Sequence, residues 1–137
     1  MREVILVCGV PGSGKTWVCR QLPPDKFQYI PHDEHLKDIV RALAVAARTS
    51  SLPIVTECPF GERGMREQLE TLGCVVKPVF VVESPDVIWR RYADREGKSP
   101  SKSTMTRASS IINRAEEWGA PHGTSSHILN YLLKEKA

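Results

Sequence analysis

Apolar residues along this chain of 137 residues fall into short continuous runs, separated by longer segments in which they recur at helical spacing. A strand that is buried on both faces is apolar throughout, whereas a half-exposed strand alternates. The run at residues 4–8 therefore predicts a buried strand, and three more strands are predicted at residues 27–30, 52–56 and 79–82. Strands that alternate with helices along a chain predict a parallel sheet with right-handed crossovers.

Helical segments are predicted between and after these strands. They cover residues 15–22, residues 33–47, a segment with Met65, Leu69 and Leu72 on one face, residues 85–96, residues 104–118 and a last segment that begins after Thr124. Pro23 ends the first of these helices and Gly73 the third, while Ser84 is suited to cap the fourth. The pattern predicts one α/β domain over residues 1–137, with a sheet of four to five parallel strands and helices on both faces. Trp17, Trp89 and Trp118 occupy apolar helical positions and are predicted to lie in the core.

The loop after the first strand carries the sequence Gly9-Val10-Pro11-Gly12-Ser13-Gly14-Lys15-Thr16, which satisfies the pattern G-x-x-x-x-G-K-[ST]. Glycines let the backbone curl so that its N–H groups converge on phosphate oxygens, and the helix that follows points its positive end at the same anion. In this pattern the lysine reaches the β- and γ-phosphates and the hydroxyl after it ligates Mg²⁺. The sequence therefore predicts a site for ATP and Mg²⁺ with the ligands Gly9, Pro11, Gly12, Ser13, Gly14, Lys15 and Thr16.

Charge and cysteine content narrow the picture further. The net charge is +3, but residues 86–114 alone hold seven Lys or Arg against three acids, so this segment should attract an anionic ligand. Four cysteines are scattered without a Cys-x-x-Cys pair, which favours reduced structural thiols over a disulfide or zinc. No apolar stretch is long enough to cross a bilayer. A cytoplasmic location, or the host cytoplasm for a phage protein, is the expectation.

These motifs, taken in order, resemble those of the small P-loop kinases over nearly the whole chain. The form of the phosphate loop, an acidic residue just after the second strand and a basic segment after the fourth all match, and no Asn-Lys-x-Asp motif for guanine is present. The chain is most similar to the kinase domain of polynucleotide 5′-kinases and to related short phage and bacterial kinases. The resemblance implies a P-loop NTPase three-layer sandwich with a helical lid at about residues 90–114. It also implies transfer of the γ-phosphate of ATP to a hydroxyl group.

On the acceptor side, the resemblance implies that Asp33 is the base that takes the proton of the acceptor hydroxyl, although its position also suits a helix N-cap. His32, beside it, is a candidate substrate contact or a solvent-exposed residue. Glu57 follows an apolar strand, as does the acid that holds Mg²⁺ or its water in these kinases, where Asp is commoner; it could bind the acceptor instead. Phe60 either stacks on the acceptor or packs in the fold, and Arg63 is a candidate contact for an acceptor phosphate.

On the donor side, Arg91 and Arg95 share one helix face and resemble the lid arginines that close over the phosphates. The alternative for both is a solvated helix face with salt bridges. Arg114 resembles a further lid arginine, and Thr124 lies where these kinases hold adenine, although helix capping also explains it. Lys15, Asp33, Arg91 and Arg95 are the predicted catalytic set.

Three functions fit these features. The first is a kinase acting on nucleic acid, either at the 5′-hydroxyl of DNA or RNA or at a hydroxymethyl group on a modified base, as in DNA modification by phage. The second is a kinase for a small acceptor such as a nucleotide, nucleoside or sugar. The third is a nucleotide-binding regulator without turnover, against which the presence of Asp33 argues. Assembly into a homo-oligomer is compatible with all three.

Overall fold

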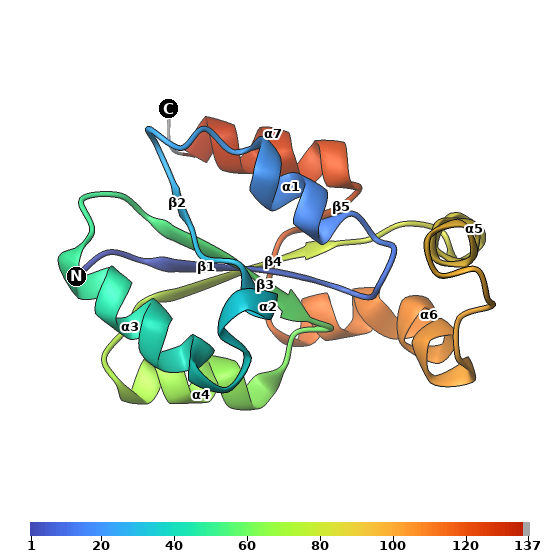
Figure 1. The fold of residues 1–137 in the computed structure, drawn as a ribbon, viewed down its shortest axis with the longest axis horizontal. Coiled ribbons are helices and arrows are strands. Elements are labelled where there is room, and N and C mark those ends of the chain that lie inside the picture. The colour runs from blue at the N-terminus through green and yellow to red at the C-terminus, as the bar shows by residue number, and fades with distance from the viewer. Residues whose placement is uncertain (136–137) are drawn as a thin grey trace.

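A five-stranded parallel sheet forms the centre of the molecule in a computed structural model, which describes residues 1–135 except for the side chain of Leu36. The strands are β1 (Val4–Gly9), β2 (Gln28–Tyr29), β3 (Ile54–Pro59), β4 (Val76–Val81) and β5 (His122–Gly123), and they lie in the order β2-β3-β1-β4-β5 (Figure 1). β1 is paired in parallel on both sides, with β3 and with β4, and all six of its residues are buried. The four predicted strands are present, and the short β5 lies between the helix predicted over residues 104–118 and the one predicted after Thr124.

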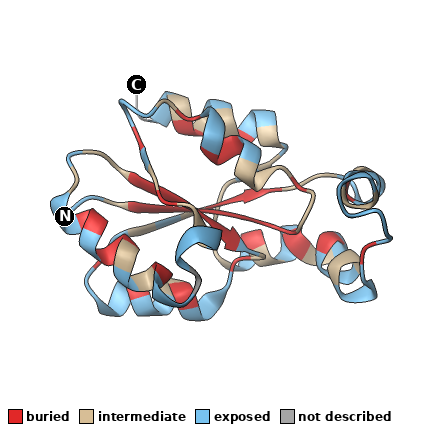
Figure 2. Ribbon diagram, viewed as in Figure 1, coloured by how far each residue is buried: buried red, intermediate tan, exposed pale blue. Residues whose placement is uncertain are grey.

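Helices cover both faces of this sheet (Figures 1 and 2). α1 (Lys15–Gln21) and α7 (Ser125–Glu135) pack on one face. α3 (Ile39–Thr49), α4 (Arg63–Thr71) and α6 (Lys102–Glu117) pack on the other. α5 (Pro85–Glu96) lies beyond the carboxyl ends of the strands, and the short α2 (His32–His35) continues through a 3₁₀ turn at Leu36–Asp38 into α3. The predicted three-layer sandwich is confirmed.

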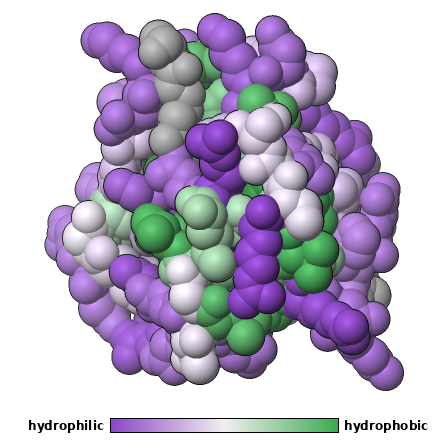
Figure 3. All heavy atoms as spheres, turned by 90° about the vertical axis from the view of Figure 1, so that its left-hand side faces the viewer, coloured by the Kyte–Doolittle hydropathy of each residue, from purple (hydrophilic) through white to green (hydrophobic). Residues whose placement is uncertain are grey.

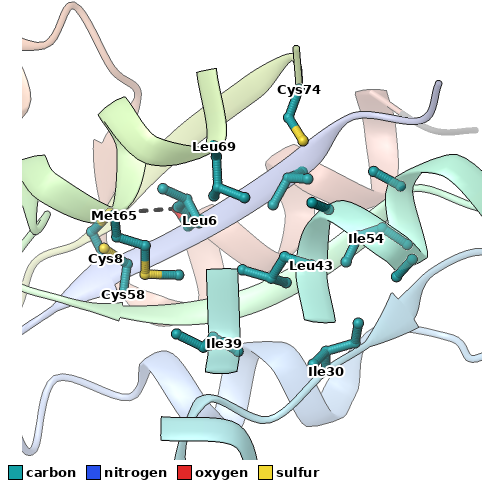
Figure 4. Close-up of a cluster of buried hydrophobic side chains, with 14 of the residues drawn as sticks. Leu6, Cys8, Ile30, Ile39, Leu43, Ile54, Cys58, Met65, Leu69 and Cys74 are labelled. Carbon is teal, nitrogen blue, oxygen red and sulfur yellow. Dashed lines mark hydrogen bonds between the residues drawn. The ribbon is translucent and has the colours of Figure 1, made fainter. Parts of the chain in front are cut away.

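Two apolar clusters, one on each face, hold the layers together. Alternate residues of β1 serve the two clusters: Leu6 and Cys8 face α3 and α4, whereas Ile5 and Val7 face α1 and α7. Figure 4 shows the first cluster, in which Leu43, Met65 and other apolar side chains converge on β1 and β3. All four cysteines are buried, as the sequence predicts for structural thiols. Because β1 is packed against apolar clusters on both faces of the sheet, the loop that follows it begins at a firmly held strand.

The predicted lid segment, at about residues 90–114, includes parts of α5 and α6, and these two helices differ in how far they are buried. Only Ile88 of α5 is buried, so that helix is loosely anchored. α6 instead buries Ile111 and Ala115 in the cluster beneath the sheet. The connection between them ends where the Ser101 side chain caps α6, accepting a hydrogen bond from the Thr104 backbone N–H at 3.1 Å. Mobility on the scale of a lid is therefore easier for α5 than for α6.

Several local predictions were wrong. Trp17 and Trp89 are 45% and 46% exposed, because α1 and α5 each bury a single face and these rings lie off it. Trp118 alone is partly buried, with its ring 5.6 Å from that of Phe80. The helix predicted over residues 33–47 is interrupted by the 3₁₀ turn, so Asp33 lies in a separate short helix.

The end of the molecule where the strands begin is remote from the phosphate loop. Figure 3 faces this end and shows apolar surface among hydrophilic side chains. Met1, Val45, Leu72 and Val75 are the exposed apolar residues from the N-terminus, α3 and the connection between α4 and β4. Within residues 1–135, no helix combines the length and the hydropathy needed to cross a membrane.

Candidate active site

The phosphate loop connects the buried end of β1 to the first turn of α1. Its backbone folds back through a hydrogen bond from the Ser13 N–H to the Val10 carbonyl at 3.1 Å, and the Val18 N–H donates to the Gly14 carbonyl at 3.0 Å to start the helix. The Ser13 side chain is fully buried, and within the described residues its hydroxyl has no hydrogen-bond partner. A cavity of about 240 Å³ opens above this loop; it is lined by Gly12, Gly14, Lys15, Thr16, Trp17, Arg91 and Arg95.

Two glycines of the loop are required by its geometry. Gly12 has φ +87° and Gly14 has φ +102°, conformations that strain any residue with a Cβ. A Cβ on Gly12 would lie 3.1 Å from the Ile88 carbonyl oxygen of α5, and one on Gly14 would lie 3.2 Å from the Ser125 Cβ at the start of α7. The absence of side chains therefore lets α5 and α7 reach the phosphate loop.

Replacing Gly12 by alanine is expected to destabilise the fold by about 1–3 kcal/mol, the usual cost of a strained backbone position. It should also weaken ATP binding, because the new Cβ pushes α5 away from the cavity. Gly64→Ala is the matched control: a Cβ on Gly64 meets nothing within 4 Å, and Gly64 lies in α4, where alanine should stabilise by roughly 0.5–1 kcal/mol. Urea unfolding and titration with a fluorescent ATP analogue measure both effects. Wild-type affinity in Gly12→Ala would contradict this role.

Lys15 is the first residue of α1 and projects into the cavity. Burial lowers its pKa, and the Glu57 carboxylate opposes that effect. Arg95 lowers the pKa further, while Asp33 raises it. The pKa of Lys15 is therefore affected by Glu57 of β3, Arg95 of α5 and Asp33 of α2. All three were predicted from the sequence as site residues. Among the described residues no acid forms an ion pair with Lys15, which leaves its positive charge suited to bind phosphate.

Glu57, on β3, has a carboxylate that accepts hydrogen bonds from three other residues. Its Oε2 accepts hydrogen bonds from the Thr16 hydroxyl at 3.0 Å and the Tyr29 hydroxyl at 2.5 Å, and its Oε1 accepts one from the His32 backbone N–H at 3.2 Å. Burial pushes the pKa of Glu57 up, but these hydrogen bonds outweigh it, and the pKa lies below the ordinary value. Glu57 is therefore an ionised carboxylate at neutral pH.

The Thr16 hydroxyl and the Glu57 carboxylate fit the hard oxygen ligands that Mg²⁺ requires. Among residues 1–135 there is no cluster of three or more His, Cys, Asp or Glu side chains that could enclose a metal by themselves. This pattern suits Mg²⁺, which keeps several waters and binds through one or two protein oxygens together with substrate phosphates. The two predicted metal ligands, Thr16 and Glu57, are hydrogen-bonded to each other.

Asp33 lies in α2 at the carboxyl edge of the sheet, and its side chain is 98% exposed. The His32 ring lies beside it, with Nδ1 3.7 Å from the carboxylate. In the described part of the chain, no backbone N–H donates to this carboxylate, so the structure does not support the alternative of a helix N-cap. His32 is held through its backbone by Glu57, which fixes α2 beside the metal ligands.

Arg91 of α5 lies directly against the phosphate loop. Its Nη1 donates hydrogen bonds to the Gly12 carbonyl at 3.3 Å and to the Ser13 carbonyl at 3.4 Å, and it lies 3.9 Å from Glu83. Arg95 lines the same cavity, but its Nε bonds Glu96 at 3.0 Å. Both predicted lid arginines therefore lie at the cavity above the phosphate loop, and Arg95 is also engaged with Glu96.

Phe60, Arg63 and Arg114 form a separate group beyond the end of β3. Phe60 adopts φ +48°, and the guanidinium groups of Arg107 and Arg114 each lie over its ring, at 5.6 and 5.5 Å from its centre. Arg63 and Arg114 both pair with Glu117 of α6. The structure thus places Arg114 over Phe60, and it does not line the phosphate cavity. Phe60 is also partly buried against two apolar clusters of the fold, which favours the packing alternative over stacking on an acceptor.

Thr124 caps α7, because its hydroxyl accepts a hydrogen bond from the His127 backbone N–H at 3.3 Å. The next residue, Ser125, touches the phosphate loop at Gly14. The start of α7 therefore lies beside the phosphate loop, and the capping alternative for Thr124 is present in the structure. Sequence reasoning missed Tyr29 and Arg107, whose roles depend on contacts between distant segments.

Comparison with known proteins agrees with this fold. No protein-family model matches the chain, and no curated protein sequence matches significantly. The tunicamycin resistance protein of Deinococcus radiodurans has a similar structure, with a TM-score of 0.73 and 15% identity over 98% of this chain and 95% of that chain. Shikimate kinase from Acinetobacter baumannii gives 0.54 and 15% over 99% and 96%, and a gluconokinase from Sinorhizobium meliloti 1021 gives 0.54 and 20% over 80% and 74%. The chain has the P-loop NTPase fold, and its structural neighbours include P-loop kinases.

Proposed function

We propose that this protein is an ATP-dependent kinase that transfers the γ-phosphate to a hydroxyl group of a small acceptor. The observation that carries the proposal is the Glu57 carboxylate, which bonds the Thr16 hydroxyl of the donor loop and the backbone of the α2 segment that presents Asp33. Donor and acceptor groups are thereby fixed to one another. A protein that only binds nucleotide has no need of such a link.

Each residue has a part that its position supports. The phosphate loop and Lys15 bind the ATP phosphates, and Arg91 and Arg95 stabilise the charge on the group in transfer. Thr16 and Glu57 would hold Mg²⁺, which when bound neutralises charge on the phosphates. The exposed Asp33 carboxylate orients the acceptor hydroxyl and takes its proton as the new O–P bond forms and the bond to the β-phosphate oxygen breaks.

A small acceptor is favoured over nucleic acid by two observations. The structural neighbours named above, together with a sugar kinase from Janibacter sp. HTCC2649, carry names that refer to small molecules. The Phe60 ring, which could have stacked on a base, is covered by Arg107 and Arg114. The second candidate, transfer to a 5′-hydroxyl or a hydroxymethyl base, is supported by the excess of basic residues within 86–114.

One assay with three groups of acceptors tests the proposal. Purified protein, Mg²⁺ and ATP labelled at the γ-phosphate are incubated with a panel of sugars, sugar acids, nucleosides and nucleotides, with 5′-hydroxyl oligonucleotides, and with hydroxymethyl-pyrimidine DNA. Label is expected in the small-molecule panel. Label only in oligonucleotides or DNA would establish the second candidate, and tight ATP binding without transfer to any acceptor would favour the regulator.

A further inference from the structure

Tyr29 makes a contact that the fold does not require. It is one of only two residues of the edge strand β2, and its backbone pairs with Val55 of β3. Its ring packs at the margin of the cluster beneath α1 and α7, where phenylalanine would pack equally well. The hydroxyl nevertheless extends along the face of the sheet to Glu57, two residues further along β3, and donates a hydrogen bond of 2.5 Å to its Oε2.

This hydrogen bond is short, and it ends on an atom with a second partner. Charge-assisted O–H···O⁻ bonds of about 2.5–2.7 Å are among the strong hydrogen bonds of proteins. The same Oε2 accepts the Thr16 hydroxyl at 3.0 Å. The two hydroxyls therefore fix one carboxylate oxygen between them, from β2 on one side and from α1 on the other.

Glu57 needs such a restraint because its side chain has three rotatable bonds. Burial of the residue, which is 7% exposed, does not by itself choose among rotamers that aim the carboxylate differently. The His32 backbone N–H holds Oε1, but only at 3.2 Å. Loss of the Tyr29 bond would leave Oε2 with the Thr16 hydroxyl alone, the group that must also face the metal.

We propose that Tyr29 is a positioning residue, which holds Glu57 Oε2 against the Thr16 hydroxyl and thereby sets the affinity of the nucleotide complex for Mg²⁺. The inference rests on the proposed function only through the metal site of Thr16 and Glu57, and not through the identity of the acceptor. Tyr29 touches neither nucleotide nor acceptor in this scheme. Its effect is exerted through the carboxylate that it orients.

The test is the metal affinity of Tyr29→Phe, measured with Mn²⁺ as a paramagnetic probe in the presence of ADP. Partners one step removed from a metal typically change its affinity by about 10–100-fold, and we expect a loss of roughly tenfold. ADP affinity in EDTA should stay within a factor of about two, because the phosphate loop is unchanged. Tyr131→Phe is the matched control: it removes a similar Tyr–Glu bond of 3.1 Å, to Glu135 on the exposed side of α7, and should leave Mn²⁺ affinity unaltered.

A merely structural role for Tyr29 gives a different result. ADP binding in EDTA would fall together with Mn²⁺ binding, and extra Mg²⁺ would not restore turnover, whereas the proposal expects restoration at high Mg²⁺. In Glu57→Gln, Mn²⁺ affinity should fall at least as far, and adding Tyr29→Phe should change little more, because the two act as one unit. If Glu57→Gln weakens Mn²⁺ binding and Tyr29→Phe does not, the inference fails alone. If neither does, the metal site of the proposed function fails with it.

Discussion

Replacing Lys15 by methionine is expected to lower kcat/KM roughly 10³-fold, at the upper end of the effect of removing one preorganised group that stabilises transition-state charge. Methionine keeps the length and the apolar stem of the side chain but removes its charge. That charge faces the phosphate cavity under the influence of Glu57 and Arg95. Most of the loss should appear in kcat, because the backbone N–H groups of the loop still bind the ATP phosphates. Steady-state kinetics with the best acceptor of the panel measure both parameters.

Lys26→Met is the control for this substitution. Lys26 is exposed and lies just before β2, at the end of the sheet opposite the phosphate loop. Its replacement should leave kcat and KM within a factor of about two, in line with other surface changes. Unfolding curves for both variants separate a local effect from loss of the fold. Lys15→Met with near-normal turnover would remove Lys15 from the catalytic set.

The fold of the phosphate loop could be predicted from the sequence because its information is local. Eight consecutive residues, Gly9 to Thr16, encode the loop, and the apolar run before them encodes the buried strand that carries it. The positive φ at Gly12 and Gly14 follows from the same pattern. The parallel sheet and the sandwich follow from alternation of strands and helices, although the two-residue β5 is too short to leave a periodic signal.

What the sequence could not reveal depends on contacts between distant segments. Tyr29 and Glu57 are separated by 28 positions, and Arg91 and the Gly12 carbonyl by 79. Nothing in the pattern near Phe60 indicates that two arginines of α6 cover its ring. The tryptophans were predicted to be buried because their side chains are apolar. Trp17 and Trp89 are exposed, because no other layer of the fold covers the helix faces on which they lie.

Asp33→Asn is expected to lower kcat by about 10²–10⁴-fold, the range over which a positioned base contributes. Asparagine has the same shape but cannot accept the proton of the acceptor hydroxyl. ATP affinity should be unchanged or slightly tighter, because the substitution removes a negative charge that acts on Lys15 and touches no part of the loop. Single-turnover transfer of the γ-phosphate and titration with an ATP analogue measure the two quantities separately.

The exposure of Asp33 makes this substitution decisive. A carboxylate that is 98% exposed, with the His32 ring 3.7 Å away, contributes little to folding, so a large loss of kcat in Asp33→Asn has no structural explanation. Asp38→Asn tests the same change five residues later, at the junction with α3, where it should leave transfer intact. Equal losses in both variants would point to the charge of the segment as a whole. Loss in Asp33→Asn alone identifies the group that meets the acceptor, and unchanged transfer would assign the base to another residue at this edge of the sheet.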